Sequence, residues 1–134
     1  MIHNGGMDQS TANRFAASWL EAWNAHDLDG VLAHFADDAV FTSPVAAQIL
    51  PETGGVLRGK QEIRRYWSAG LERIPDLRFS IENLYTGVDT VVVNYRNHVG
   101  GLVCEVLRLA DGLVVRGDGT YLSQDAAAAS GVDA

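Results

Sequence analysis

The sequence is poor in cysteine and lysine, and it contains no long hydrophobic run. Cys104 is the only cysteine among 134 residues, which excludes an internal disulfide bond and favours a reducing compartment. Acidic residues outnumber basic ones by 17 to 10, and the net charge of −7 argues against a nucleic-acid partner. No apolar run reaches the length of a bilayer span, and the first residues do not resemble a secretory signal. We therefore expect a cytoplasmic protein that binds neither nucleic acid nor membrane.

The composition is that of a soluble globular protein, with 47% hydrophobic and 20% charged residues. A chain of this length corresponds to one domain whose core needs no disulfide or metal to hold it together. We place the domain at residues 10–122, between a flexible leader at 1–9 and a flexible tail at 123–134 that is rich in small residues.

Helical periodicity dominates the first half of the chain. Phe15, Trp19 and Trp23 recur every four residues and predict one apolar helix face. Two further helices are predicted at about 28–36 and 60–74, because each range has an apolar stripe with helical spacing.

Alternation with a period of two dominates the second half. Strands are predicted at 77–82, 90–98, 102–110 and 113–122, with Gly-Gly and Asp-Gly turns between the last three. Another strand is predicted at 39–43. The pattern indicates an α+β domain, in which three N-terminal helices pack on a curved, mostly antiparallel sheet. Such a sheet, wrapped on a few helices, forms a cone that encloses a pocket.

Residues 44–58 form the longest predicted connection, fifteen residues with two prolines and a Gly-Gly pair. This is long for a compact domain, and such connections are often lids or binding loops. The alternative is a plain surface excursion with a short strand at 55–57. The sequence does not decide between the two.

The glycine pair at 100–101 predicts a two-residue hairpin turn, which would place Arg96 directly opposite Glu105. Asn94 and His98 would share that face. Periodicity alone sends this polar face to solvent, because the other face is richer in valine. If the polar face lines a cavity instead, Arg96 would hold Glu105 ionised, at a floor that can bind a carbonyl group or move a proton.

Five segments carry a recognisable series of motifs: 19–30, 35–41, 59–67, 75–77 and 105–112. They include Phe-Ala-Asp-Asp-Ala-Val-Phe and Glu-Val-Leu-Arg-Leu-Ala-Asp-Gly. The series resembles the nuclear transport factor 2-like superfamily, in particular its SnoaL-like and ketosteroid-isomerase-like bacterial members. This resemblance implies a cone-shaped fold with a pocket. It does not choose a function, because the superfamily includes isomerases, cyclases, dehydratases and non-catalytic binding modules.

The resemblance to ketosteroid isomerases extends to three functional positions. Their general base, an aspartate before a proline, corresponds to Ser43. Their tyrosine oxyanion donor corresponds to Trp19, and their protonated aspartate donor corresponds to Glu105. Only Glu105 keeps a carboxyl group, and a serine cannot move a proton at neutral pH without a partner base. Steroid isomerisation of the family type is therefore not expected.

Glu105 is the candidate acid/base, and Arg96 is the residue expected to tune it. Six further residues are expected to contact a ligand: Trp19, Ser43, Trp67, Asn94, His98 and Tyr121. No group of His, Cys, Asp or Glu has metal-ligand spacing, and there is no Gly-rich phosphate loop. We therefore expect neither a metal ion nor a cofactor.

These residues support two functional hypotheses. The first is an isomerase, cyclase or dehydratase that acts without metal on a small apolar carbonyl compound. The second is a non-catalytic module of the same fold that binds a small ligand or only dimerises. In both cases, the apolar outer face of the sheet is expected to pair two copies as a homodimer.

Overall fold

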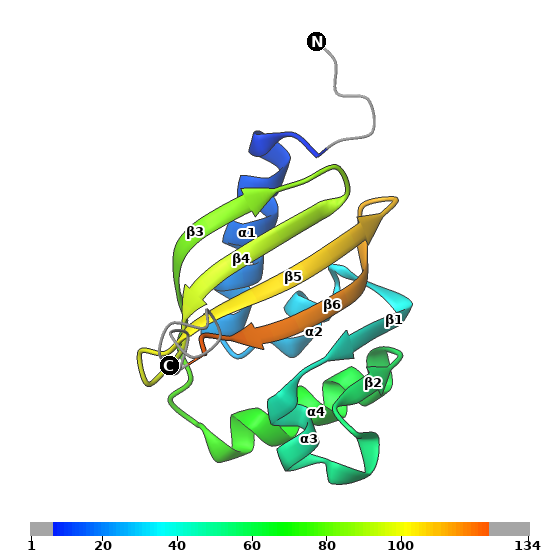
Figure 1. Cartoon of the computed structure of the whole chain (residues 1–134), viewed down its shortest axis with the longest axis vertical. Helices are drawn as coiled ribbons and strands as arrows, with labels where there is room; N and C mark the ends of the chain where they lie inside the picture. Colours follow the sequence, from blue (N-terminus) through cyan, green and yellow to red (C-terminus); the bar gives the residue numbers. More distant parts are fainter. Residues whose placement is uncertain (1–6, 124–134) are drawn as a thin grey trace, which may run out of the picture.

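The computed structural model describes residues 7–123, and it shows a curved sheet with helices packed against one face (Figure 1). In chain order, the elements are α1 (Gln9–Asn24), α2 (Leu28–Leu32), β1 (Phe35–Thr42), α3 (Pro44–Ile49), a 3₁₀ turn (Pro51–Thr53), β2 (Val56–Arg58), α4 (Lys60–Arg73), β3 (Ser80–Thr86), β4 (Thr90–Arg96), β5 (Leu102–Ala110) and β6 (Leu113–Tyr121). Residues 1–6 of the predicted leader and 124–134 of the predicted tail lie outside the described residues.

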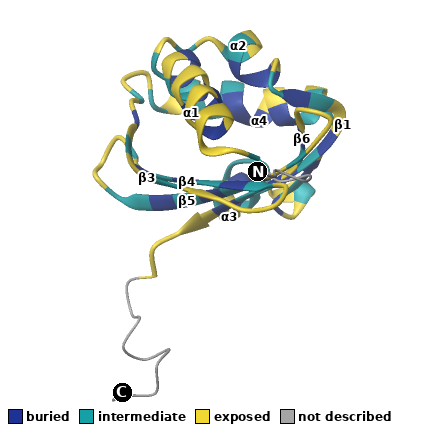
Figure 2. Cartoon of the chain, turned by 90° about the horizontal axis from the view of Figure 1, so that it is seen from above, coloured by how far each residue is buried: buried dark blue, intermediate teal, exposed yellow. Residues whose placement is uncertain are grey.

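The six strands form one sheet in the order β2-β1-β6-β5-β4-β3. All neighbouring strands are antiparallel except β1 and β6, which are parallel. Helices α1, α2 and α4 lie on the same side of the sheet, and their buried side chains face it (Figure 2). The α+β class with a mostly antiparallel sheet is therefore confirmed.

Helix α1 is fixed at both ends by polar side chains. Asp8 caps its start by accepting a hydrogen bond from the backbone N–H of Thr11 at 2.7 Å. At the other end, the Asn24 amide bonds both the N–H and the carbonyl oxygen of Phe79, at 2.8 and 3.0 Å. His26 bonds the carbonyl oxygen of Leu77 at 2.8 Å. The backbone at 77–79 is thus held by Asn24 and His26, and β3 begins at Ser80, three residues later than the alternation predicted.

The second helix is shorter than predicted, and the first strand is longer. Helix α2 ends at Leu32, and Phe35 already belongs to β1. Phe35, Ala39 and Phe41 are buried, while Asp37 and Asp38 are exposed on a strand instead of closing a helix. The pairing of β1 with β6 shifts register between Phe35 and Val40. The exposed Asp37 interrupts the alternation of buried residues that would have identified this part of the strand.

The 44–58 connection contains a short helix and a short strand, and the strand is the one that the second interpretation predicted at 55–57. Residues Val56–Arg58 form a short strand that pairs with β1. Before it lies helix α3, which the sequence pattern does not predict. Ser43 caps α3 by accepting a hydrogen bond from the N–H of Val45 at 3.1 Å, and Pro44 occupies the first helical position.

The predicted register of the β4–β5 hairpin is wrong. Val93, not Arg96, lies opposite Glu105. The connection has five residues, 97–101, because the Asn97 side chain accepts hydrogen bonds from the N–H groups of Val99 and Gly101, at 3.2 and 2.9 Å. The pairing therefore shifts by three residues, and an odd shift sends every side chain of β4 to the other face of the sheet.

Candidate functional site

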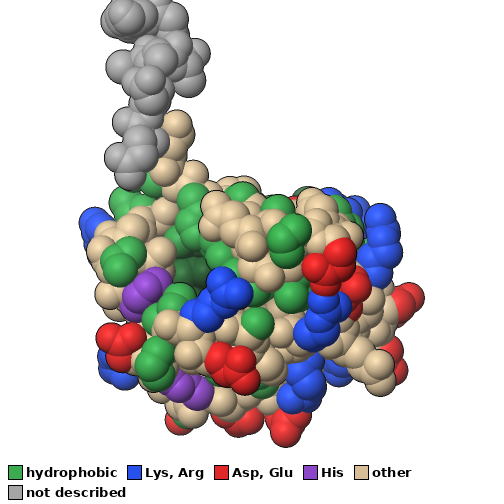
Figure 3. Space-filling view, turned by 90° about the horizontal axis from the view of Figure 1, so that it is seen from below, with side chains coloured by type: hydrophobic (Ala, Val, Ile, Leu, Met, Phe, Trp, Pro, Cys, Tyr) green, Lys and Arg blue, Asp and Glu red, His purple; other side chains and the backbone are tan. Residues whose placement is uncertain are grey.

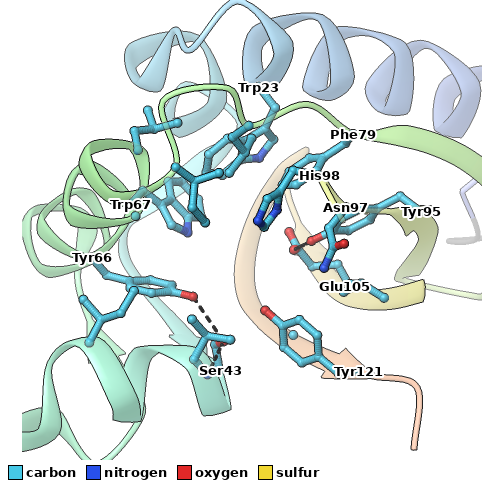
Figure 4. A pocket seen from close by; sticks show the side chains of 18 of the residues that line it. Trp23, Ser43, Tyr66, Trp67, Phe79, Tyr95, Asn97, His98, Glu105 and Tyr121 are labelled. Carbon is cyan, nitrogen blue, oxygen red and sulfur yellow. Dashed lines mark hydrogen bonds between the residues drawn. The ribbon is translucent and has the colours of Figure 1, made fainter. Parts of the chain in front are cut away.

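A cavity of about 150 Å³ opens between the inner face of the sheet and helices α3 and α4. Figure 3 shows its mouth as a hollow lined by hydrophobic side chains, and Figure 4 shows the polar groups that face into it. The lining residues are Trp23, Phe41, Ser43, Val45, Ile49, Tyr66, Trp67, Gly70, Leu71, Ile74, Leu77, Phe79, Tyr95, Asn97, His98, Val103, Glu105, Gly119 and Tyr121.

Aromatic rings form one wall of the cavity. The rings of Trp23 and Trp67 meet edge to face, with centroids 5.0 Å apart. Phe79 lies 5.5 Å from Trp23 and 4.4 Å from Tyr95, measured between ring centroids. Each such pair adds about 0.5–1.5 kcal/mol beyond the burial of its surface. The wall favours a ligand with a flat, apolar body.

Glu105 is the only charged side chain that is buried in the described part of the chain, and its relative exposure is 5%. The hydroxyl group of Tyr95 donates a hydrogen bond to Glu105 Oε1 at 3.1 Å. Glu105 Oε2 has no hydrogen-bond partner. A buried carboxyl oxygen without a partner is costly when the group is ionised, so it is poised to bind a donor or to hold a proton.

Burial raises the pKa of Glu105 from 4.5 to about 7, because an ionised carboxylate loses its hydration there. The hydrogen bond from Tyr95 opposes this effect by stabilising the ionised form. The Trp19 indole also lowers this pKa, although its N–H makes no hydrogen bond of standard geometry. At neutral pH, Glu105 is therefore present in both protonation states.

A second polar group, the hydroxyl cluster, consists of Ser43, Tyr66 and Tyr121. The hydroxyl oxygens of Ser43 and Tyr66 lie 3.2 Å apart, and the Tyr121 side chain points toward this pair (Figure 4). Burial raises the pKa of both phenols above their usual value of 10. The three hydroxyl groups are therefore neutral hydrogen-bonding groups at the cavity surface, not acids.

Four of the residues predicted to contact a ligand line the cavity: Ser43, Trp67, His98 and Tyr121. Trp19 does not, because it is fully buried behind the wall, with its ring 5.3 Å from that of Tyr95.

The predicted tuning of Glu105 by Arg96 is wrong, for the reason of register given above. Arg96 lies on the outer face of the sheet, where it donates hydrogen bonds to Glu82 Oε2 at 3.2 Å and to the carbonyl oxygen of Gly100 at 2.8 Å. Asn94 is also on the outer face, where it accepts a hydrogen bond from Asn83. Burial, and not a neighbouring cation, sets the protonation state of Glu105.

Three residues that line the cavity were not among those expected to contact a ligand: Tyr95, Tyr66 and Gly119. Tyr95 was assigned to the outer face by the incorrect hairpin register. Tyr66 precedes Trp67 on α4, and both are buried because they lie on adjacent parts of one apolar stripe. The parity of β6 alone would have placed Gly119 inward with Tyr121, but it gave no sign that a glycine matters there.

The described residues show no metal-binding group and no membrane-spanning helix. Across residues 7–123, no three His, Cys, Asp or Glu side chains are grouped so as to hold a metal ion. None of the helices in the same range is both long and apolar enough to cross a bilayer.

Comparison with known proteins agrees with this architecture. The family model of the SnoaL-like domain matches residues 16–117, which is most of the chain. The chain belongs to the SnoaL-like family. No curated protein matches it significantly.

Solved structures of SnoaL-like and related proteins resemble this one. A SnoaL-like protein of unknown function from Burkholderia thailandensis is 40% identical, with a TM-score of 0.83, and the match covers 88% of this chain and 99% of that one. A candidate ketosteroid isomerase from Kribbella flavida is 18% identical, with a TM-score of 0.65 and coverage of 85% and 79%. A candidate polyketide cyclase from Sinorhizobium meliloti is 16% identical, with a TM-score of 0.69 and coverage of 85% and 100%. The last two likenesses show the fold alone.

Proposed function

We propose that this SnoaL-like protein binds a small, mainly apolar carbonyl compound in the cavity, and that Glu105 moves a proton at the carbon next to the carbonyl group. The observation that carries the proposal is the carboxyl group of Glu105, which is buried beside an apolar cavity with Oε2 unpartnered. Its pKa of about 7 supports acid/base work at neutral pH, because both the proton acceptor and the proton donor are then populated.

The chemistry follows from these two protonation states. Ionised Glu105 removes a proton from the carbon, and the electron pair of the C–H bond moves to the carbonyl oxygen to form an enolate. If a C=C bond is conjugated with the enolate, return of the proton from Glu105 to the far carbon of that bond completes an isomerisation. Attack of the enolate carbon on a second carbonyl group of the same molecule closes a ring, and the proton on Glu105 passes to the new alkoxide oxygen. In a dehydration, the β-hydroxyl group takes the proton from Glu105 and leaves as water. All three reactions need the same first step. The structure therefore supports enolate-forming chemistry in general more than any one of the three reactions.

A non-catalytic binding role is the second candidate, and Ser43 is the observation that favours it. The family resemblance places a catalytic carboxylate at this position, and a serine hydroxyl has no comparable basicity. Glu105 is also the only carboxyl group that lines the cavity among the described residues. Under this alternative, a ligand would stabilise the protein and be released unchanged.

Exchange of carbon-bound hydrogen separates the two candidates. In D₂O, an enolising protein replaces the hydrogens next to the carbonyl group of a cyclic ketone such as 2-indanone, and ¹H NMR measures the loss of their signal. We expect wild type to accelerate this exchange and Glu105→Gln to abolish the acceleration, because an amide cannot accept the proton. Glu82→Gln is the matched control, since it makes the same chemical change on the exposed outer face.

The result against catalysis is equally clear. If Glu105→Gln accelerates the exchange as well as wild type does, Glu105 is not the base. If 2-indanone raises the melting temperature of wild type without any exchange, the non-catalytic role is favoured.

A further inference from the structure

We propose that the carbonyl oxygen of the ligand binds at the Ser43–Tyr66 hydroxyl pair, and that Gly119 keeps open the space between this pair and Glu105. Gly119 would then determine which groups can reach the carboxyl group. This inference rests on the proposed function. It adds where the carbonyl oxygen of the ligand binds and which space the neighbouring carbon occupies.

The hydroxyl pair has one hydrogen-bond donor to spare, whichever way its protons point. Ser43 Oγ already accepts a hydrogen bond from the N–H of Val45, and it shares a second bond with the Tyr66 hydroxyl. Two hydroxyl groups carry two protons, and their mutual bond uses one of them. If Tyr66 donates, both lone pairs of Ser43 are occupied and the serine proton is free. If Ser43 donates, the phenol proton of Tyr66 is free.

Tyr121 does not remove this surplus. Its hydroxyl group adds one donor and one acceptor to the hydroxyl cluster, so a chain of three hydroxyls still ends in one free proton. A free donor at the surface of an apolar cavity favours a ligand with an acceptor oxygen, because leaving the donor unpaired costs free energy.

Gly119 lies between the hydroxyl pair and Glu105. It is paired directly with Glu105 across strands β5 and β6. A Cβ atom at Gly119 would lie 3.7 Å from both Cβ and Oγ of Ser43, and 3.6 Å from the carbonyl oxygen of Thr42. These are ordinary contact distances, so packing does not require a glycine there. A side chain would instead occupy cavity space beside the carboxyl group.

Gly117, two residues earlier on the same face, shows the contrast. A Cβ atom there would lie 2.8 Å from Cδ1 of Phe41 and 2.9 Å from Cδ2 of Leu107, so its glycine is needed for packing. At Gly119 the missing side chain leaves room for a ligand. With its oxygen at the hydroxyl pair, a ring ketone would lie over Gly119, and its neighbouring C–H bonds would face Glu105. Its apolar body would contact the aromatic wall, and a cavity of about 150 Å³ suits a compound of one or two small rings.

The first test compares 2-indanone with indane, which lacks only the carbonyl oxygen, by ligand-observed NMR titration. The double variant Ser43→Ala/Tyr66→Phe should bind 2-indanone about tenfold more weakly and indane unchanged, because it removes both hydroxyl groups of the pair and keeps the apolar wall. Each single variant should lose less, because it leaves one hydroxyl group in place. Indane binding also shows that the variant, which lacks the cap of α3, is folded.

The second test enlarges Gly119. Gly119→Ala should fold normally and slow the Glu105-dependent exchange of 2-indanone by about tenfold or more, because the methyl group displaces the ligand from the carboxyl group. The matched control is Gly87→Ala, in the turn between β3 and β4. A Cβ atom there also meets its nearest neighbour at 3.6 Å, and the exchange rate should not change.

The outcomes separate this inference from the proposed function. If exchange depends on Glu105 but the double variant and Gly119→Ala behave as wild type, the proposed function stands and this inference is overturned. The carbonyl oxygen would then bind elsewhere, for example at the indole N–H of Trp23, which is buried without a partner. If wild type neither binds the ketone nor accelerates its exchange, both are overturned.

Discussion

Glu105 combines two properties that oppose each other in most proteins: it is a carboxyl group, and it is almost fully buried. Within residues 7–123, no cation compensates its charge, and the partners that oppose its protonation are the Tyr95 hydroxyl and, more weakly, the Trp19 indole. Ionisation of Glu105 therefore costs folding free energy, and the cost depends on pH. This gives a test of its environment that needs no ligand.

The free energy of unfolding should depend on pH in the way that a raised carboxyl pKa requires. A pKa of about 7 in the folded state against 4.5 when unfolded corresponds to about 3 kcal/mol. This contribution is fully present below pH 4.5 and is lost as the pH rises through 7. Glu105→Gln does not ionise, so its free energy of unfolding relative to wild type should increase by about 2–3 kcal/mol between pH 5 and pH 8. Urea unfolding at several pH values measures this, and a difference that is flat with pH would refute the raised pKa.

Tyr95→Phe should raise the pKa of Glu105 further. The mutation removes the hydrogen bond to Oε1, which favours the ionised form, so the midpoint should rise by about one pH unit. A ¹³C NMR titration of the Glu105 carboxyl carbon reports the midpoint directly. Tyr85→Phe, which alters an exposed tyrosine on β3, should leave it unchanged. A midpoint that falls in Tyr95→Phe would contradict the assigned contact.

The sequence allowed part of this site to be predicted. The family resemblance pointed to Ser43 and Glu105, because both lie within or next to recognisable sequence motifs. It could not give the state of Glu105, because that depends on the absence of a cation and on Tyr95, which reaches the carboxyl group only through the strand register. Trp19 was misplaced because the matched helix position is covered here by Tyr95 and Phe79.

Among the elements, the β4–β5 connection had the largest effect on the predicted site. Gly-Gly is a strong signal for a two-residue turn, but the side chain of Asn97 closes a longer loop and Gly100 takes a positive φ of 80°. One side chain thus decides which face of β4 meets the helices. Long helices and the last two strands were predicted nearly to their ends, since their periodicity is strong. Helix α3 was missed because six residues are too few to show a period.

Asn97→Ala should destabilise the protein by about 1–2 kcal/mol, because the N–H groups of Val99 and Gly101 lose their acceptor. Asn97→Asp is the matched control, since it keeps an oxygen atom at the same place and should retain most of the stability. Urea unfolding of the two variants provides the comparison. Equal losses in both would show that the acceptor oxygen does not hold the loop.

At the scale of the whole molecule, the outer face of the sheet is the surface through which two copies could pair. Val92, Cys104 and Val106 lie on this face, each half-buried, whereas Val91 and Val93 of β4 are buried on the face that carries Glu105. Arg116 and Asp118 form an ion pair on neighbouring β6. We propose that two copies pair through this face, because a two-fold axis would cover the apolar strip and bring charges of both signs to its edge.

Light scattering after size-exclusion chromatography tests this assembly. The molar mass measured for wild type should be twice the mass of one chain. Val106→Arg should give the mass of a monomer, because the mutation puts a charge in the middle of the apolar strip. Glu21→Arg, on the exposed side of α1, should remain a dimer. Wild type that is monomeric at tens of micromolar would contradict the proposal.

The central claim is that buried Glu105 moves a proton of a ligand held in the cavity. The pH profile of hydrogen exchange in 2-indanone, with Glu105→Gln as the reference, tests it most directly. We expect the wild-type acceleration to rise with pH to a plateau, with a midpoint near 7, and to be absent from the variant. An acceleration that persists in Glu105→Gln, or a profile without a midpoint between pH 6 and 8, would contradict the claim.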